Sequence, residues 1–296
     1  MSARFPALDT PRYVLGEGPA WHAPTGTLSW VDIDDGLVLS APFDGERIGP
    51  VRTRALGGVV GCAVPLDSGR FLVALEAWIG VVDEAGALAE RSRALLGTNQ
   101  RFNDGKIDPQ GRFVVGSLRR QGGADGRQVL LRLEHDGAIT TLDDDLDLAN
   151  GLGWSPDGEV LYSIDSARRV VYARRYGERV GPRSVLVEVD GMPDGMTVDD
   201  DGNLWITVID GCAVRCHRPD GTLVPERTID LGRLHPASAE FAGPALDRLV
   251  ITTGFPRLEY GADHALRSPS DGAVIVAVPG SRGLPPTPWS PVPLPG

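Results

Sequence analysis

The sequence predicts an all-β protein folded as a six-bladed β-propeller. Three observations favour this fold: a repeat of short strands about every 45 residues, many glycines and prolines, and no long amphipathic helical pattern. The chain has 296 residues with 38 glycines and 24 prolines, which is typical of a protein with many tight turns. A β-sandwich array is the alternative, but a sandwich does not require a repeat of this length.

The repeat is carried by turn glycines that each precede an apolar run with the character of a strand. Five such turns are separated by 43, 42, 47 and 44 residues, and their glycines are Gly26, Gly69, Gly111, Gly158 and Gly202. A sixth turn, at Leu246 and Asp247, has no glycine and lies about 45 residues further on, which is within the range of one propeller blade.

The ends of the chain are expected to close the ring. Only about five complete units fit between the first and last turns, so we expect chain-terminal strands to share one blade. Residues 273–278 form a strong final strand. We expect one propeller domain over residues 1–296, in which the proline-rich residues 284–296 are an extended surface segment.

Composition excludes several classes of function. The net charge of −11 disfavours a general phosphate-binding surface, so we expect no nucleic-acid partner. No apolar stretch approaches the length needed to cross a membrane, and residues 1–13 do not resemble a signal peptide. Three cysteines do not make a disulfide framework in a chain of this size. We therefore expect a cytoplasmic protein with reduced thiols, whose oligomeric state the sequence leaves open.

Four polar residues lie in the segments that lead into the innermost strands. Each lies near a glycine and eight or nine residues before its turn glycine, and the four are Glu17, Asn103, Asn150 and Asp194. Equivalent positions in a radial repeat occupy equivalent heights around the axis. These side chains should therefore face one another near the mouth of the central channel.

Two carboxylates and two amides describe a site with oxygen ligands. Such a site suits a hard divalent cation such as Ca²⁺ or Mg²⁺, or Mn²⁺, better than structural Zn²⁺. The alternative is that Asn-Gly and Asp-Gly are simply turn signals. The four residues lie at matching distances from their turn glycines in four repeats, which favours a metal site over isolated turn signals.

Two other chemistries are disfavoured by spacing. Cys216 and His217 are near Cys212, but adjacent residues on one strand point to opposite faces, which argues against a zinc site there. The sequence contains no Gly-x-Ser-x-Gly elbow, which argues against a serine hydrolase.

Several motifs together resemble one known family. They are LGEGP at residues 15–19, RFNDGK at 101–106, DPQGR at 108–112, NGL at 150–152 and PDGM at 193–196. With residues 241–253 they cover nearly the whole chain in the right order. The sequence is similar to the SMP-30/gluconolactonase/regucalcin family, and the motif that begins at Arg101 is the most specific of these signals.

The resemblance implies a six-bladed propeller with one divalent metal at its axis. It implies metal ligands at Glu17, Asn150 and Asp194, and substrate contacts at Arg101 and Asn103. The implied reaction is hydrolysis of a sugar-acid lactone, in which the metal polarises the carbonyl and Asp194 activates or positions water. Ca²⁺ is the expected ion, with Mg²⁺, Mn²⁺, Zn²⁺ or Fe²⁺ as alternatives.

Two alternatives stay open on the same residues. One is an aryl-ester or phosphotriester hydrolase, and the other is a calcium-binding or ligand-sensing propeller without turnover.

One loop departs from the family pattern. Some members bring a carboxylate to the substrate after the Arg101 motif, whereas this chain has Arg119 and Arg120 and no carboxylate before Asp125. The hypothesis is that the loop at residues 119–123 shifts substrate choice toward a more electronegative ligand. A mobile surface loop without such a role is the alternative.

Overall fold

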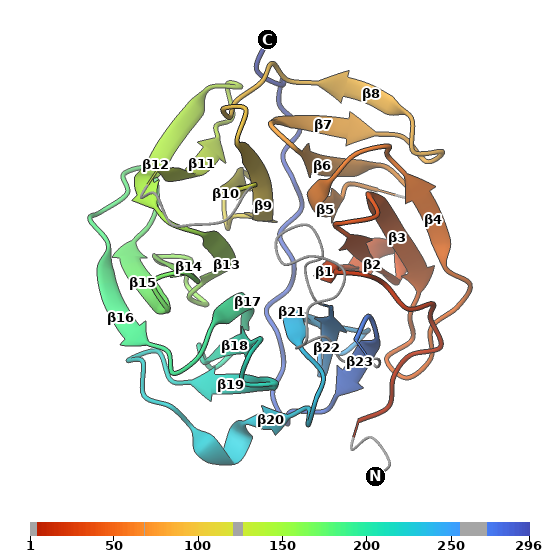
Figure 1. Ribbon diagram of the computed structural model, residues 1–296, viewed down its shortest axis with the longest axis vertical. Coiled ribbons are helices and arrows are strands. Elements are labelled where there is room, and N and C mark those ends of the chain that lie inside the picture. Colours follow the sequence, from red (N-terminus) through yellow and green to blue (C-terminus); the bar gives the residue numbers. More distant parts are fainter. Residues whose placement is uncertain (1–4, 68, 121–126, 255–270) are drawn as a thin grey trace.

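The chain forms a ring of six antiparallel β-sheets arranged around a central axis (Figure 1). The computed structural model describes residues 5–67, 69–120, 127–254 and 271–296. Five sheets have four strands and the sixth has three, and each strand pairs with its neighbour in sequence. The predicted six-bladed propeller is confirmed. The described residues form no helix of the length and apolar character that crossing a bilayer requires.

Each blade uses consecutive strands, with the first at the axis and the last at the rim (Figure 1). Blade 1 contains β1 (Gly16–His22), β2 (Thr27–Asp32), β3 (Leu37–Pro42) and β4 (Arg52–Ala55). Blade 2 contains β5 (Val60–Pro65), β6 (Phe71–Leu75), β7 (Trp78–Val82) and β8 (Leu88–Arg91). Blade 3 contains β9 (Gln100–Ile107), β10 (Phe113–Arg119), β11 (Gln128–Leu133) and β12 (Ile139–Leu146).

The second half of the ring repeats this plan. Blade 4 contains β13 (Ala149–Trp154), β14 (Val160–Asp165), β15 (Val170–Arg175) and β16 (Ser184–Glu188). Blade 5 contains β17 (Pro193–Val198), β18 (Leu204–Val208), β19 (Ala213–His217) and β20 (Ile229–Asp230). Blade 6 contains β21 (Pro236–Ala242), β22 (Arg248–Thr253) and β23 (Val274–Ala277). Two short 3-10 helices, η1 (Ala23–Thr25) and η2 (Pro225–Arg227), complete the described elements.

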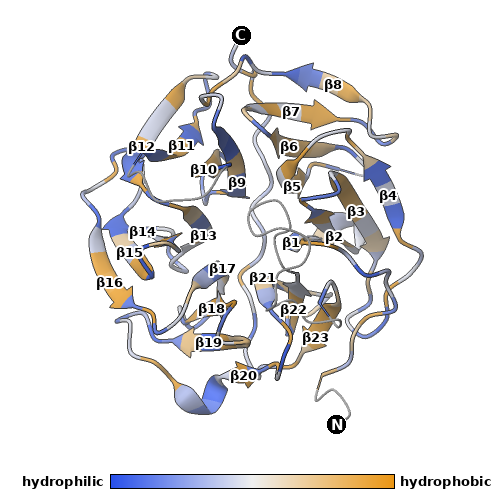
Figure 2. Cartoon of the chain, in the orientation of Figure 1, coloured by the Kyte–Doolittle hydropathy of each residue, from blue (hydrophilic) through white to orange (hydrophobic). Residues whose placement is uncertain are grey.

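The core lies between the blades. Among the described residues, each of six apolar clusters is drawn mainly from two neighbouring blades. Trp205 of blade 5 and Phe241 of blade 6, for example, meet edge to face with their ring centroids 6.2 Å apart. Figure 2 shows the same contrast between buried and exposed strands: the mostly buried β7 is hydrophobic, and the mostly exposed rim strand β4 is hydrophilic. Burial between blades therefore holds the ring together.

The ring closes in blade 6. Ala7 forms an antiparallel bridge with Ile275, and Leu8 donates its N–H to Val274 O at 2.8 Å. A segment from the start of the chain thus lies against β23, which comes from near its end. The prediction that chain-terminal strands share one blade holds only in part, because the N-terminal segment contributes an isolated bridge and no strand to the three-stranded blade 6.

The turn after each inner strand needs a left-handed residue. Gly111 has φ 83°, a conformation that favours glycine, and a Cβ built on it would also lie 2.4 Å from Ser290 Oγ, which would have to rotate away. The sixth turn has Leu246 at φ 53° instead. A non-glycine residue in this region costs about 1–2 kcal/mol, so packing of the Leu246 side chain against the core has to offset that strain.

Residues 284–296 cross the ring and carry neither helix nor strand. In Figure 1 this segment passes over the centre of the ring to the terminus beyond β8. Ser290 donates its N–H to Gly111 O at 2.9 Å, and Arg93 donates to Pro295 O at 2.8 Å. Trp289 packs on the core between blades 2 and 3.

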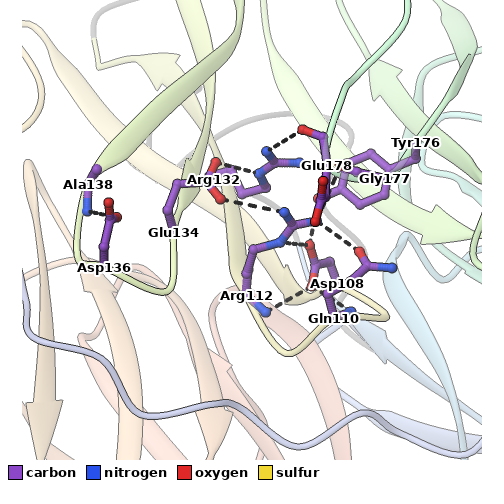
Figure 3. A network of polar contacts seen from close by, with 10 residues as sticks. All are labelled: Asp108, Gln110, Arg112, Arg132, Glu134, Asp136, Ala138, Tyr176, Gly177 and Glu178. Carbon is purple, nitrogen blue, oxygen red and sulfur yellow. Dashed lines mark hydrogen bonds and ion pairs between the residues drawn. The ribbon is translucent and has the colours of Figure 1, made fainter.

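A buried polar network ties the turn after β9 to blade 4 (Figure 3). Asp108 is fully buried and accepts hydrogen bonds from Arg112 Nε and Tyr176 Oη, each at 2.7 Å. The guanidinium groups of Arg112 and Arg132 lie 5.6 and 5.5 Å from the centre of the Tyr176 ring. The Asp108 carboxylate thus joins two blades in addition to shaping its own turn.

Candidate active site

A β-bulge interrupts the inner strand of every blade at about the same height. The pairing register of β1, β5, β9, β13, β17 and β21 with the next strand shifts there. Bulges re-aim side chains and are frequent beside functional sites. In each blade the residue at or directly after the last regular pair before the shift can be compared: it is polar in four blades and small in the other two, and the six are Glu17, Gly61, Asn103, Asn150, Asp194 and Ala237. Glu17 itself still pairs with Val31 and stands directly before its bulge, whereas the other five are unpaired. The four polar residues are equivalent in this register, as expected. They lie within the inner strands β1, β9, β13 and β17, however, and not in segments that lead into those strands, because the strand after each turn glycine is the second strand of its blade.

Three side chains of the predicted site form one hydrogen-bonded chain across blades 3 and 4. Arg101 donates from Nη1 to Asn103 Oδ1 at 2.9 Å, and Asn103 donates from Nδ2 to Asn150 Oδ1. Asn103 Nδ2 also reaches Ala149 O at 3.1 Å. Asn150 donates its own amide N–H to Ser166 Oγ at 2.7 Å. These bonds fix the orientation of both amides, since each nitrogen has an acceptor.

The backbone of Asp194 lies directly against that of Asn150. A Cβ built on Gly151 would lie 2.7 Å from both Asp194 O and Met196 N. Glycine is therefore required after Asn150 because the two inner strands approach too closely for a side chain. This contact brings the ligand positions of blades 4 and 5 together.

Glu17 is electrostatically linked to Asp194. Its side chain is 4% exposed, and the pKa of its carboxyl is raised well above the usual range, first by burial and then by the charges of Asp194 and Asp104. The Gly18 N–H donates to Glu17 Oε2 at 3.0 Å and opposes that shift. Two carboxyls from blades 1 and 5 therefore act on one another near the axis.

Asp104 is a member of the site that sequence reasoning did not assign. It is 9% exposed, and burial raises its pKa to about 6, against the opposing charges of Lys106 and Arg101. The other polar blades have glycine at this second bulge position, at Gly18, Gly151 and Gly195. The Asn-Asp-Gly sequence was the available signal, because it inserts a carboxylate where the other blades have none.

Lys106 crosses the axis beside these residues. Its Nζ lies 2.7 Å from Glu240 Oε2 of blade 6 and donates to Met196 O of blade 5 at 3.1 Å. Glu240 Oε1 accepts a further bond from Thr197 Oγ1 at 2.6 Å. Lys106 is the one lysine in the sequence, and its contacts fasten blade 3 to blades 5 and 6.

The donor set fits a hard cation. No group of three His, Cys, Asp or Glu side chains within the described part of the chain is arranged to hold a metal ion. The expected set has a different composition, with carboxylates from Glu17 and Asp194 and an amide from Asn150. Glu17, Asp104 and Asp194 are buried close enough to raise the Glu17 pKa, and a divalent cation would offset that repulsion. Oxygen donors of this kind suit Ca²⁺, Mg²⁺ or Mn²⁺.

The loop that departs from the family pattern is described only at its start. Arg120 Nη1 lies 3.5 Å from Glu76 Oε2, and both side chains are partly exposed. Residues 121–123 lie outside the described residues. Blade 2 thus supplies a carboxylate to the arginine of this loop.

Comparison with known proteins shows what this ring is similar to. The model of the SMP-30/Gluconolactonase/LRE-like region matches residues 15–255. Pentonolactonase XacC of Haloferax volcanii is 35% identical over 267 residues, which cover 88% of this chain and 88% of that protein. A 6-deoxy-6-sulfogluconolactonase of Pseudomonas putida is 34% identical over 278 residues, which cover 90% of this chain and 93% of the relative.

A solved structure shares the fold. Regucalcin of Agrobacterium tumefaciens, described as a calcium-binding protein, has a TM-score of 0.84 at 22% identity and covers 97% of each chain. This likeness concerns the fold alone. On the family match and the two relatives, the chain belongs to the SMP-30/gluconolactonase family.

Proposed function

We propose that this protein hydrolyses a sugar lactone with the help of one divalent metal ion held by Glu17, Asn150 and Asp194. The observation that carries the proposal is the shared height of these residues and Asn103 at the bulges of four inner strands. Two relatives that cover most of the chain are named as lactonases, which supports the substrate class.

Arg101 and Asn103 are proposed to bind the sugar. A guanidinium carries five N–H donors, and an amide carries both donors and an acceptor, which suits a polyhydroxylated ligand. Arg101 Nη1 is held by Phe102 O at 3.0 Å and by Asn103 Oδ1 at 2.9 Å. The group is thus preorganised, so that binding costs little side-chain entropy.

Asp194 is proposed to position the attacking water. In the reaction, water adds to the ester carbonyl, the bond from that carbon to the ring oxygen breaks, and the ring oxygen takes up a proton. A bound cation supplies Lewis acidity toward the carbonyl. A cation also lowers the basicity of a carboxylate beside it, so Asp194 acts mainly by orienting water and less by removing its proton.

The test is hydrolysis of a panel of aldonolactones by metal-stripped protein with single ions added back. The ions are Ca²⁺, Mg²⁺, Mn²⁺, Zn²⁺ and Fe²⁺, and the enzyme-free rate is subtracted because lactones open spontaneously. Turnover on a lactone that depends on an added ion supports the proposal. Turnover confined to aryl esters or phosphotriesters would favour the alternative hydrolase. Thermal stabilisation by metal without any turnover would indicate a binding protein.

A further inference from the structure

Two buried aspartates hold the chain in front of two proposed ligands. Asp32, at the end of β2, accepts the N–H of Val14 at 2.8 Å on Oδ2 and that of Leu15 at 3.1 Å on Oδ1. These two N–H groups belong to the residues three and two positions before Glu17. Asp32 itself is 1% exposed.

Blade 4 repeats this arrangement atom for atom. Asp165, at the end of β14, accepts the N–H of Asp147 at 3.0 Å on Oδ2 and that of Leu148 at 3.2 Å on Oδ1. These are the residues three and two positions before Asn150, and Asp165 is fully buried. We call this pair of bonds the aspartate brace.

The neighbouring bonds match as well. In blade 1 the N–H of Ile33 donates to Leu15 O at 3.1 Å, and in blade 4 the N–H of Ser166 donates to Leu148 O at 3.0 Å. The residue before each ligand pairs with the aspartate in the ladder, as Gly16 with Asp32. The two blades therefore hold their ligand-bearing strands by one common device.

The other blades have different residues at the brace position. In the pairing register it is occupied by Leu75, Ser117, Val208 and Thr253. In blade 5, Met192 donates its N–H to Asp210 Oδ1 at 2.7 Å, but Asp210 is exposed and makes one such bond. Within the described residues, the buried brace coincides with the blades of Glu17 and Asn150.

We propose that Asp32 and Asp165 are positioning residues that fix Glu17 and Asn150 for the metal ion. The inference rests on the proposed function, because it concerns the same metal. The ladder is irregular at Asn150 and directly after Glu17, so the place of each ligand depends on the residues just before it. Bonding two successive N–H groups to one rigid carboxylate fixes that segment in direction as well as in position.

Blade 4 extends the brace to a ligand side chain. Ser166 follows Asp165, and its Oγ accepts the amide N–H of Asn150 at 2.7 Å. The amide oxygen is thereby turned toward Asn103, which donates to it. Asp165 and Ser166 together hold both the backbone and the side chain of Asn150.

A purely structural role makes a different prediction. Asp165 Oδ1 also accepts the N–H of Arg168 at 3.3 Å, which is a turn-capping bond. If capping were the whole role, loss of the carboxylate would lower stability and leave metal affinity unchanged. Asp199 is a matched control, because it is fully buried and accepts the N–H groups of Asp201 and Asn203 at 3.1 and 2.8 Å. It follows the end of β17 that is remote from Asp194.

The experiment is calorimetric titration of Ca²⁺, and of Mn²⁺, into chelator-treated full-length protein. The variants are Asp32→Asn, Asp165→Asn and the control Asp199→Asn. Each keeps the shape of the side chain but replaces one acceptor oxygen with a donor. We expect the metal dissociation constant to rise about 10-fold in the first two, as for other outer partners of metal ligands, and to stay near the wild-type value in the control. The melting temperature without metal should fall in all three.

The other possible results distinguish the positioning role of Asp32 and Asp165 from the proposed function itself. Unchanged affinity in Asp32→Asn and Asp165→Asn, with lowered melting temperatures, would overturn the positioning role and leave the proposed function standing. Absence of Ca²⁺ and Mn²⁺ binding in the wild type would overturn both. If the Asn variants do not fold, Asp32→Glu and Asp165→Glu keep the charge and both acceptors on a longer side chain. Weakened affinity in those variants supports the brace, and wild-type affinity contradicts it.

Discussion

Gly151→Ala should separate the ligand positions of blades 4 and 5. An alanine Cβ at residue 151 would lie 2.7 Å from Asp194 O and from Met196 N, both of which are backbone atoms. Backbone atoms of a packed inner strand cannot rotate away as a side chain can. The strand that carries Asp194 therefore has to move away from the one that carries Asn150.

The size of this movement follows from the contact distance. Ordinary van der Waals contact of a Cβ begins at 3.4 Å, so relief of the clash requires a shift of about 0.7 Å. Overpacking of this kind costs about 1–3 kcal/mol of folding stability. A misplacement of about 1 Å in a reacting constellation costs about 100-fold in rate, so we expect kcat/KM to fall by at least about 10-fold.

Gly153→Ala is the matched control for this variant. Gly153 lies two residues after Gly151 on β13. An alanine Cβ there would lie 2.8 Å from Val198 Cγ2, a side-chain atom on β17. We expect a smaller loss of melting temperature, because a side chain can adjust where backbone cannot, and lactone turnover close to that of the wild type. The comparison needs initial rates on the best lactone and thermal melts of both variants. Equal kcat/KM in Gly151→Ala and Gly153→Ala would refute the link between this contact and the site.

Three further predictions test other parts of the account. Asp104→Asn should stabilise the metal-free protein above about pH 6, because the raised pKa of this buried carboxyl makes its charged form unfavourable in the folded state. This gain in stability over the wild type should shrink as the pH falls from about 6 to about 4, because the carboxyl then becomes neutral in the folded and the unfolded state alike. Thermal melts across this range in which the difference between the variant and the wild type does not change with pH would contradict the reasoning. Asp108→Asn should lower the free energy of unfolding by about 1–3 kcal/mol in urea titrations, because it removes the nearer of the two carboxylates that pair with the buried Arg112 and leaves only Glu134 at 3.5 Å. The KM for lactone should not change, and a large change would place Asp108 in the site after all. Replacing Arg119 and Arg120 by alanine should lower the rates on anionic lactones relative to neutral ones, and identical relative rates across the panel would contradict a role of this loop in substrate choice.

The periodic features of the fold could be predicted because they repeat along the chain. Turn glycines such as Gly111 recur once per blade, and the fixed distance back from each turn marks Asn103, Asn150 and Asp194 as equivalent. Which strand of the blade is innermost was not predicted, because the strand before the turn and not the one after it lies at the axis. A contact between the two chain ends in one blade was also expected, since the repeats did not fill six complete units, although the N-terminal segment forms a bridge there and no strand. That Ala7 pairs with Ile275 could not be predicted, because a single short segment has no periodic signal.

Contacts between blades could not be predicted from periodicity. Lys106 reaches Met196 and Glu240 across the axis, and no spacing in the sequence relates these residues. The effect of the Asp104 charge on the Glu17 pKa could not be predicted either, because it depends on how blades 1 and 3 face each other. Asp32 stands out in the sequence only as one acidic residue in an apolar run, and its bonds to the segment before Glu17 appear only once the strands are paired.

The most direct test of the account is the rate of lactone hydrolysis as metal is added back to stripped protein in known equivalents. We expect the rate to rise with added ion and to reach its plateau at about one equivalent per chain, as for a single tight site. Asp194→Ala should bind the ion more weakly and show no rate above the enzyme-free background. A full rate in the presence of chelator, or wild-type turnover by Asp194→Ala, would contradict it.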